Sequence, residues 1–437
     1  MKFSMGNDFF YKRSKFGWSF LGVPNSKKNS FKIIVLVKVG SKNENKENFG
    51  VAHFLEHMSA KSTKTAKNSL ELSRRIDKIG GEFNASTSFE TTLYYDLLPA
   101  NKLRFGIFDL KDRICDSVYQ EKDIEIEKGV ILEEYNMYED DPQTHVYEAF
   151  LERIFGKDTG LGHKILGTKE TIKSINKEKL INFKNSFYSG ENILIGAIGK
   201  FNPEKTFEIL EEEFRDFFAK DDCYKEISEK EFLEDIGSEK IIALSDKKTE
   251  QTHFVFGFRT KGRKSKEKFI YSLISKYLGG TMSSRLFREI REKLGLAYYI
   301  GSSSNAYENI GSFVVYAGVE KSSFLKALEK CLLEIKKLKE GKISKKDLSI
   351  SKSNSKGALK ILLDSESFLW NFYADQYIFS DDKIYSPKEV LEIMESISVD
   401  DVAKVSNEIF SSRNFYLSFC GDKSLVEKAM KVSEMII

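Results

Sequence analysis

Two histidines and a glutamate occupy a spacing that suits metal chemistry. His53, Glu56 and His57 fall within the segment GVAHFLEHM, residues 50–58. On an α-helix, residues four apart lie on the same face, so His53 and His57 can present their imidazole nitrogens to one ion. Glu56 lies beside them and can serve as a general base. Two unrelated structural histidines are the alternative, but a glutamate correctly placed within the pair makes chance a weak explanation in a chain with five histidines.

A catalytic zinc ion needs a third protein ligand and one open position for water, and two histidines with one carboxylate form a known set. The order HxxEH is the reverse of the HExxH zinc motif. Residues 121–138 mix acids and apolar side chains at helical spacing, and Glu127 and Glu134 are two helical turns apart, so both can face inward. Composition alone favours a solvated acidic face, but the HxxEH motif reverses that preference. We predict that Glu134 is the third ligand and that Glu127 orients a ligating imidazole or receives its proton.

The elements that must position these residues follow from hydrophobic periodicity. The β-rich segment 30–39 predicts a strand, a polar turn follows it, and the helix that carries His53 begins near Gly50. A helix over 70–79 ends at Gly80-Gly81 and leads into two strands within 82–98, with a turn near Ser88. The same half contains further predicted helices at 102–117, 121–138 and 205–218 and a strand at 192–199.

The second half repeats this order of elements. A strand at 253–258 is followed by helices at 267–278 and 285–294, by Gly295, by two strands within 297–318, by a helix at 322–338, and later by a strand at 414–420. This weak internal repeat predicts two similar α+β domains, each an antiparallel-rich sheet covered by helices. The polar, acidic stretch before residue 240 is the best candidate linker. We therefore predict domains at 1–222 and 240–437 with a linker at 223–239.

The composition limits the classes of function. With 437 residues, 41% of them hydrophobic, the chain can bury two cores, and its net charge of +3 gives no strong field for nucleic acid or an anionic membrane. No apolar run approaches transmembrane length, so the cytoplasm is the expected compartment. His145, His163 and His253 lack ligand spacing and are predicted to be structural or surface histidines. Four cysteines form no CxxC pair and are predicted to be buried or free thiols, at Cys115, Cys223, Cys331 and Cys420.

The motif and its surroundings resemble the pitrilysin/insulinase family of inverted-motif zinc peptidases, in its mitochondrial-processing-peptidase-type branch. The resemblance extends over most of the chain, through EKGVILEEYNMYEDDP, GGEFNASTSFETTLYY, LGHKILGT and SSRLFREIREKLGLAYYI. It implies a Zn²⁺ cofactor held by His53, His57 and Glu134, with Glu56 as catalytic base and Glu127 as the outer acid. The chain departs from the family directly after HFLEHM. Family members commonly have an apolar residue, a basic residue and Gly-Thr there, whereas this chain has Ser59-Ala-Lys-Ser-Thr63.

The resemblance also implies how a substrate would be held. Two residues seven apart in the second domain, Arg291 and Tyr298, would grip the peptide and steady the oxyanion. Substrate would add as a strand to a sheet edge, within an enclosed chamber formed by a clamshell half, on residues Phe83, Asn84, Ala85, Ser86 and Thr87. The implied activity is endopeptidase cleavage of unfolded peptides by a homodimer, or by a heterodimer with a related chain. The alternative is a non-catalytic partner subunit of the same fold.

Overall fold

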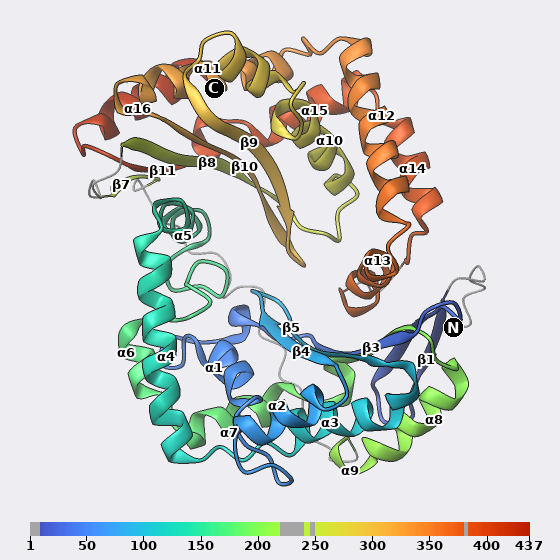
Figure 1. Ribbon diagram of the computed structural model, residues 1–437. Helices are drawn as coiled ribbons and strands as arrows, with labels where there is room; N and C mark the ends of the chain where they lie inside the picture. The colour runs from blue at the N-terminus through green and yellow to red at the C-terminus, as the bar shows by residue number, and fades with distance from the viewer. Residues whose placement is uncertain (1–8, 219–239, 245–249, 380–382) are drawn as a thin grey trace. The chain divides into compact units, whose positions relative to one another are not determined.

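The computed structural model describes residues 9–218, 240–244, 250–379 and 383–437, and it divides into two compact units (Figure 1). Unit 1 is Met1–Asn136, His163–Ser228 and Leu362–Ile384, and unit 2 is Met137–Gly162, Glu229–Ile361 and Tyr385–Ile437. The linker predicted at 223–239 lies outside the described residues. The sequence predicted contiguous domains, whereas residues 137–162 and 362–384 each belong with the opposite half of the chain.

Unit 1 is built on a six-stranded sheet with the order β1-β2-β6-β3-β5-β4. Neighbouring strands are antiparallel except β2 and β6, which are parallel. The hairpin predicted within 82–98 is β4 and β5, closed by a turn in which the Ser88 N–H donates to the Thr91 carbonyl at 2.8 Å. β4 therefore lies at an edge of the sheet. The strands are β1 (Phe10–Arg13), β2 (Ser19–Pro24), β3 (Ser30–Val37), β4 (Glu82–Thr87), β5 (Thr92–Pro99) and β6 (Ile193–Gly199).

Helices cover both faces of this sheet, because the central strands are apolar on both sides. From β3, Phe31, Ile33 and Val35 enter the larger core with α1, α3, α7 and α8, while Ile34 and Leu36 pack on the opposite face with α13 (Figure 1). The helices associated with unit 1 are α1 (Val51–Met58), α2 (Ser69–Asp77), α3 (Leu103–Cys115), α4 (Glu121–Asp140), α6 (Lys169–Ser174), α7 (Lys177–Phe187), α8 (Pro203–Glu213), α9 (Arg215–Phe218) and α13 (Glu366–Phe379).

Unit 2 contains a five-stranded sheet with the order β7-β11-β8-β10-β9, in which only the β7–β11 pair is parallel among the described strands. α5 packs against β8 and β11. The strands are β7 (Ile241–Leu244), β8 (Gln251–Lys261), β9 (Ala297–Ala306), β10 (Ile310–Glu320) and β11 (Phe415–Cys420). The helices are α5 (Pro142–Phe155), α10 (Lys268–Gly279), α11 (Phe324–Lys339), α12 (Lys345–Leu362), α14 (Pro387–Ser396), α15 (Val399–Ile409) and α16 (Leu425–Ile436).

The predicted fold class is confirmed. If β1 is set aside, both sheets have the same connectivity, with the first strand beside the last, then the second, the fourth and the third. Each sheet is antiparallel-rich and covered by helices, as the repeat indicated. Two predicted helices differ in detail. The segment 205–218 is split at Phe214 into α8 and α9, and 285–294 contains a π-helix over Phe287–Glu292.

Two further predictions concern the whole chain. No helix in the described part of the chain is both long enough and apolar enough to cross a membrane. None of Cys115, Cys331 and Cys420 is in a disulfide, and Cys223 lies outside the described residues.

Candidate metal centre

The short helix α1 carries His53, Glu56 and His57, and its first turn is held from outside the helix. Gly50 precedes it with a φ of 90°, and the carboxylate of Glu44 accepts hydrogen bonds from the backbone N–H groups of Gly50 at 2.6 Å and Ala52 at 2.7 Å. A carboxylate at this place satisfies helix N–H groups that have no partner within the helix. The first turn of α1 is thereby fixed, and with it the direction of the two imidazoles.

The three predicted ligands meet within unit 1. One carboxylate oxygen of Glu134, on α4, lies 3.7 Å from His53 Nε2 and 3.6 Å from His57 Nε2. One ligand atom from each residue lies within 4.8 Å of the others. Glu133, the adjacent acid, is exposed, as the helical spacing predicted. Two ligands bonded at ordinary zinc distances in a tetrahedral site are about 3.4 Å apart, so the donor set fits this ion with little adjustment.

The electrostatics keep His53 in the form that binds metals. Burial, followed by the neighbouring charge of His57, lowers the pKa of His53 to about 3. A neutral imidazole has a lone pair to offer, whereas a protonated one does not. The His53 Nδ1 atom is buried and has no hydrogen-bond partner among the described residues. Its Nε2 atom, which faces Glu134, is therefore the atom that would ligate.

His57 is oriented by Glu127, the acid predicted to lie outside the ligand set. Glu127 Oε1 accepts a hydrogen bond from His57 Nδ1 at 2.7 Å, and Lys61 Nζ forms an ion pair with Oε2 of the same carboxylate. Burial opposes ionisation of Glu127, but the hydrogen bond from His57 and the ion pair with Lys61 outweigh it and lower its pKa. Burial alone would lower the pKa of His57. The hydrogen bond with Glu127 and the negative charges of Glu56 and Glu134 outweigh burial and raise that pKa. An ionised acceptor at Nδ1 leaves Nε2 directed at the other ligands.

Glu56 is not among the residues of the possible ligand group, and its carboxylate contacts the end of β4. The hydroxyl of Thr87 donates to Glu56 Oε2 at 2.8 Å. Burial raises the pKa of Glu56, and the hydrogen bond from Thr87 opposes that change only in part. A carboxylate with a raised pKa is a stronger base than an exposed one, which suits a group that must take a proton from water.

The predicted substrate strand is β4, which pairs with β5 on one side only. Its side chains alternate, with Phe83, Ala85 and Thr87 half-buried and Asn84 and Ser86 exposed. The Asn84 side-chain oxygen accepts the N–H of Ala85 at 2.8 Å. α1 packs against β4, so an edge strand lies directly beside the histidines and Glu56.

Arg291 and Tyr298 lie in unit 2, on the π-helix and on β9 respectively. Both are exposed, and Tyr298 has 73% of its surface accessible. Gly295 separates them at a φ of 60°, which allows the chain to turn from the helix into β9. β9 occupies the edge position in its sheet that β4 occupies in unit 1.

Sequence reasoning missed two supports of this site, Glu44 and Lys61, which were not singled out. His163 was predicted to be a structural or surface histidine, and it is a buried structural one. His163 Nε2 lies 2.9 Å from Glu44 Oε2, so this histidine is buried against the carboxylate that holds α1. The other partners of Glu44 are the backbone N–H groups of Gly50 and Ala52, which leave no mark in a sequence. The second glycine of the segment LGHKILGT is an indirect signal of this close packing. A Cβ at Gly167 would lie 2.2 Å from the Phe49 carbonyl oxygen, so the loop can approach the start of α1 only with glycine there.

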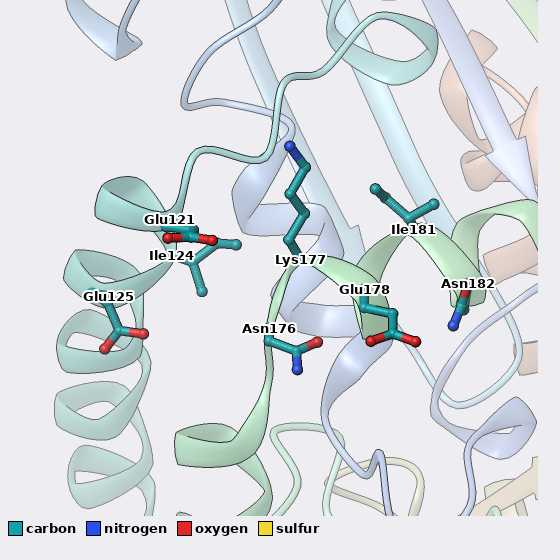
Figure 2. Close-up of a pocket in the computed structure, with 8 residues that line it drawn as sticks. All are labelled: Glu121, Ile124, Glu125, Asn176, Lys177, Glu178, Ile181 and Asn182. Atoms are coloured by element: carbon teal, nitrogen blue, oxygen red, sulfur yellow. The ribbon is translucent and has the colours of Figure 1, made fainter.

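A separate pocket of about 590 Å³ lies at the beginning of α4, against α7 (Figure 2). Ile124 and Ile181 contribute apolar surface to it, and Glu121, Glu125 and Glu178 contribute carboxylates. None of the predicted site residues lines this pocket. The candidate metal centre is therefore defined by its side-chain chemistry and not by this hollow.

Comparisons with known proteins agree with this chemistry. Residues 22–169 match the family model described as Insulinase (Peptidase family M16), and residues 174–355 match the model described as Peptidase M16 inactive domain. An uncharacterized zinc protease of Rickettsia bellii is 33% identical over 386 residues, covering 88% of this chain and 90% of the relative. An uncharacterized zinc protease of Bacillus subtilis is 34% identical over 338 residues, covering 77% of this chain and 80% of the relative.

A solved structure of a protease from Helicobacter pylori has the same fold, with a TM-score of 0.85, 23% identity, and coverage of 95% of this chain and 99% of that one. The family model and the relatives named zinc proteases place the chain in the metalloprotease class, and the group formed by His53, His57 and Glu134 could hold the metal. Within that class, the chain belongs to the insulinase family, Peptidase family M16.

Proposed function

We propose that this chain is a zinc-dependent endopeptidase that hydrolyses unfolded peptides or short precursor segments. The observation that carries the proposal is the approach of His53 Nε2 and His57 Nε2 to one carboxylate oxygen of Glu134, with Glu56 on the same helix but bonded elsewhere. A purely structural zinc site would use a fourth protein ligand, whereas three ligands leave a position for water. The proposal includes Glu56 as the base.

In this mechanism, zinc when bound acidifies a water molecule and polarises the peptide carbonyl. The residues of this chain do the remaining work. Glu56, whose pKa is raised by burial, takes the proton of the water and returns it to the leaving amine. Thr87 holds the Glu56 carboxylate in place through its 2.8 Å hydrogen bond. Glu127 keeps the His57 ring fixed throughout.

Substrate placement is proposed on the edge of β4. An extended peptide that pairs with residues 83–87 would gain backbone hydrogen bonds, and alternate side chains would give selectivity. The Ala85 N–H now donates to the Asn84 side-chain oxygen, and this hydrogen bond would have to break before the N–H could bind a peptide. Arg291 and Tyr298 are assigned to substrate and oxyanion binding, because a guanidinium can grip a carbonyl and a phenol can donate to a developing oxyanion.

Substitution of the base tests the proposal. Glu56→Gln should retain bound zinc, because Glu56 is not a ligand. It should lower the rate of cleavage of a quenched fluorescent peptide by a factor of about 10² or more. Glu133→Gln is the matched control, since Glu133 is an exposed acid on α4. It should cleave at the wild-type rate. Cleavage that survives in Glu56→Gln would show that the base is wrongly assigned.

The second candidate is a non-catalytic or obligate partner subunit of a two-chain peptidase. The match of residues 174–355 to a model described as an inactive domain favours it. Purified wild-type chain that holds zinc but cleaves nothing until a related chain is added would support this candidate. Size-exclusion chromatography with light scattering, alone and with that chain, would distinguish a homodimer from the heterodimer expected of the processing-peptidase-type branch.

A further inference from the structure

We propose that Lys61 is a positioning residue of the metal centre, which holds Glu127 so that Glu127 can hold His57. The inference rests on the proposed function, since it concerns the same site. Lys61 would touch neither substrate nor metal. Its contribution is to the affinity for the ion, through two contacts in series.

The contacts run in a line from Lys61 to the ligand. Lys61 Nζ is ion-paired with one oxygen of Glu127, and the other oxygen accepts from His57 Nδ1 at 2.7 Å. The Glu127 side chain is 2% exposed, and that of Lys61 is 26% exposed. A carboxylate so deeply buried is stable as an anion only if cationic or hydrogen-bonding partners compensate for its lost hydration. Lys61 supplies a full positive charge on the side of Glu127 that His57 does not reach.

The backbone brings Lys61 to this place. After α1 the chain continues to turn, with the N–H of Ala60 bonded to the His57 carbonyl at 3.2 Å and that of Lys61 to the Met58 carbonyl at 3.3 Å. These turns bring Lys61 to the carboxylate of Glu127, which His57 also contacts. The ion pair connects the end of α1 to α4, the two helices that supply the ligands.

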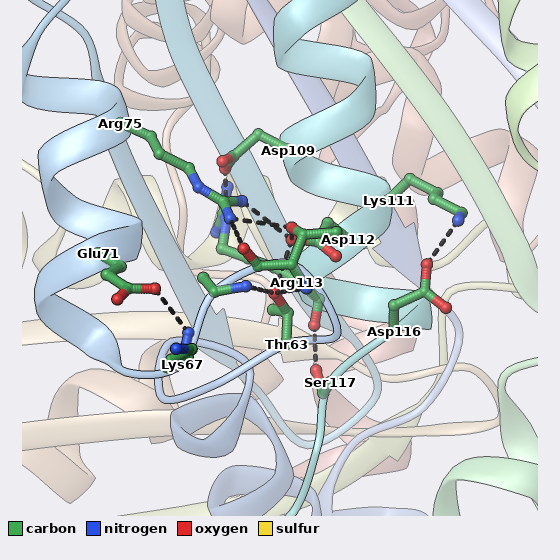
Figure 3. A network of polar contacts seen from close by, with 12 residues as sticks. Thr63, Lys67, Glu71, Arg75, Asp109, Lys111, Asp112, Arg113, Asp116 and Ser117 are labelled. Carbon is green, nitrogen blue, oxygen red and sulfur yellow. Dashed lines mark hydrogen bonds and ion pairs between the residues drawn. The ribbon is translucent and has the colours of Figure 1, made fainter.

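The residues directly after Lys61 are anchored to the end of α3. The hydroxyl of Ser62 donates to the Val118 carbonyl at 2.8 Å, and that of Thr63 donates to Asp112 Oδ2 at 2.6 Å. Asp112 is itself paired with Arg75 Nη1 at 3.0 Å (Figure 3). This network fixes the backbone that presents Lys61, so the lysine is held at both its main chain and its amine.

Loss of the ammonium should therefore weaken the metal site without removing a ligand. Without it, the Glu127 carboxylate would have one partner instead of two and would be free to turn away from His57. Replacement of groups that orient metal ligands typically lowers metal affinity by about 10- to 100-fold. We expect a loss of this size for Lys61→Met, whose side chain matches the length of the lysine stem but carries no charge.

The test compares three variants of the full-length chain. The dissociation constant for Zn²⁺ is measured by competition with a chromogenic chelator, together with thermal unfolding and peptide cleavage. Lys61→Met should bind Zn²⁺ about 10- to 100-fold more weakly, and Lys61→Arg should recover most of the affinity because it restores the charge. Lys64→Met is the matched control, since Lys64 is 72% exposed and pairs with Asp116 instead. It should bind Zn²⁺ as the wild type does.

Two outcomes would overturn the inference while leaving the proposed function intact. Wild-type affinity in Lys61→Met would show that Glu127 is held without the lysine. An equal loss of affinity and of thermal stability in Lys61→Met and Lys61→Arg would show that the side chain matters for packing and not for its charge. A wild-type chain that binds no Zn²⁺ at this site would instead refute the proposed function itself.

Discussion

At the scale of single residues, Gly50 decides where α1 can begin. Its φ of 90° lies in a region that favours glycine, and a Cβ at this position would lie 2.3 Å from the Leu166 carbonyl oxygen. Gly50→Ala should therefore destabilise the chain by about 2 kcal/mol or more, since a left-handed alanine is strained and the facing loop must move. Zinc affinity should fall with it, because the turn that precedes His53 is displaced. Urea unfolding and chelator competition would measure both effects.

Gly129 provides the contrasting substitution. It lies within α4, and a Cβ added there meets nothing within 4 Å. Gly129→Ala should stabilise the chain by about 0.5–1 kcal/mol, because alanine restricts the unfolded chain and favours a helix. Equal unfolding free energies for Gly50→Ala and wild type would show that the contact with Leu166 is not needed.

Residues with local spacing could be predicted, and residues with distant partners could not. His53, Glu56 and His57 are close in sequence, and Glu134 could be chosen because zinc needs a third donor and the helical period restricts the choice. Lys61 was within sight, directly after the motif, but its partner lies on α4 and no periodicity relates the two. The structure brings His53, His57 and Glu134 together, whereas the supports of the site depend on tertiary contacts.

At the scale of elements, hydrophobic periodicity predicted the central strands and most helices. It was less informative where packing overrides the helical period. The predicted helix 205–218 breaks at Phe214, which is fully buried and has a φ of −94° and a ψ of 0°. The helix predicted at 285–294 is wound as a π-helix over Phe287–Glu292. Neither change of winding has a signature in composition, because both depend on what the segment packs against.

A buried charge cluster between β5 and α3 supports the edge strand β4. Arg113, on α3, donates to Asp109 Oδ2 at 2.8 Å and is ion-paired with Asp96 of β5. All three side chains are at most 1% exposed (Figure 3 shows Arg113 and Asp109). Asp96 lies opposite Phe83 in the β4–β5 register, and the Phe83 ring is 4.6 Å from the Arg113 guanidinium carbon. The cluster therefore lies beneath the proposed substrate strand.

Removal of the cation should be much more costly than removal of the whole cluster. Arg113→Met should lower the free energy of unfolding by about 3–5 kcal/mol, because it leaves two buried carboxylates without their counter-charge. Adding Asp96→Asn and Asp109→Asn should recover a large part of that loss. Urea denaturation of the single and triple variants would measure the difference. A triple variant less stable than Arg113→Met would contradict this electrostatic explanation.

At the scale of the whole molecule, the internal repeat is real but the units are not contiguous. Both sheets share one connectivity, which the repeated order of elements indicated. The exchange of segments could not be predicted, because α13 follows strands β7 to β10 and helices α10 to α12 of unit 2 in the chain and yet covers a face of the unit 1 sheet. Its apolar residues fit a helix on any sheet, and only the matching surface decides which one. Gly196 of β6 is part of that surface, since a Cβ there would lie 2.4 Å from the Trp370 ring.

Trp370 is the residue whose removal tests this dependence. Its indole is 1% exposed, and its Nε1 donates to the Leu21 carbonyl of β2 at 3.0 Å. Trp370→Ala should lower the free energy of unfolding of unit 1 by about 3–5 kcal/mol, and hydrogen exchange should accelerate in β2 and β6. Phe368→Ala is the control, because this ring lies two residues earlier and is only partly buried, so its loss should be smaller. Faster exchange confined to β8 and β11 would contradict the assignment of α13 to unit 1. If exchange instead rises in β2 and β6, stability of the metal-binding unit depends on a helix encoded more than 200 residues after its ligands.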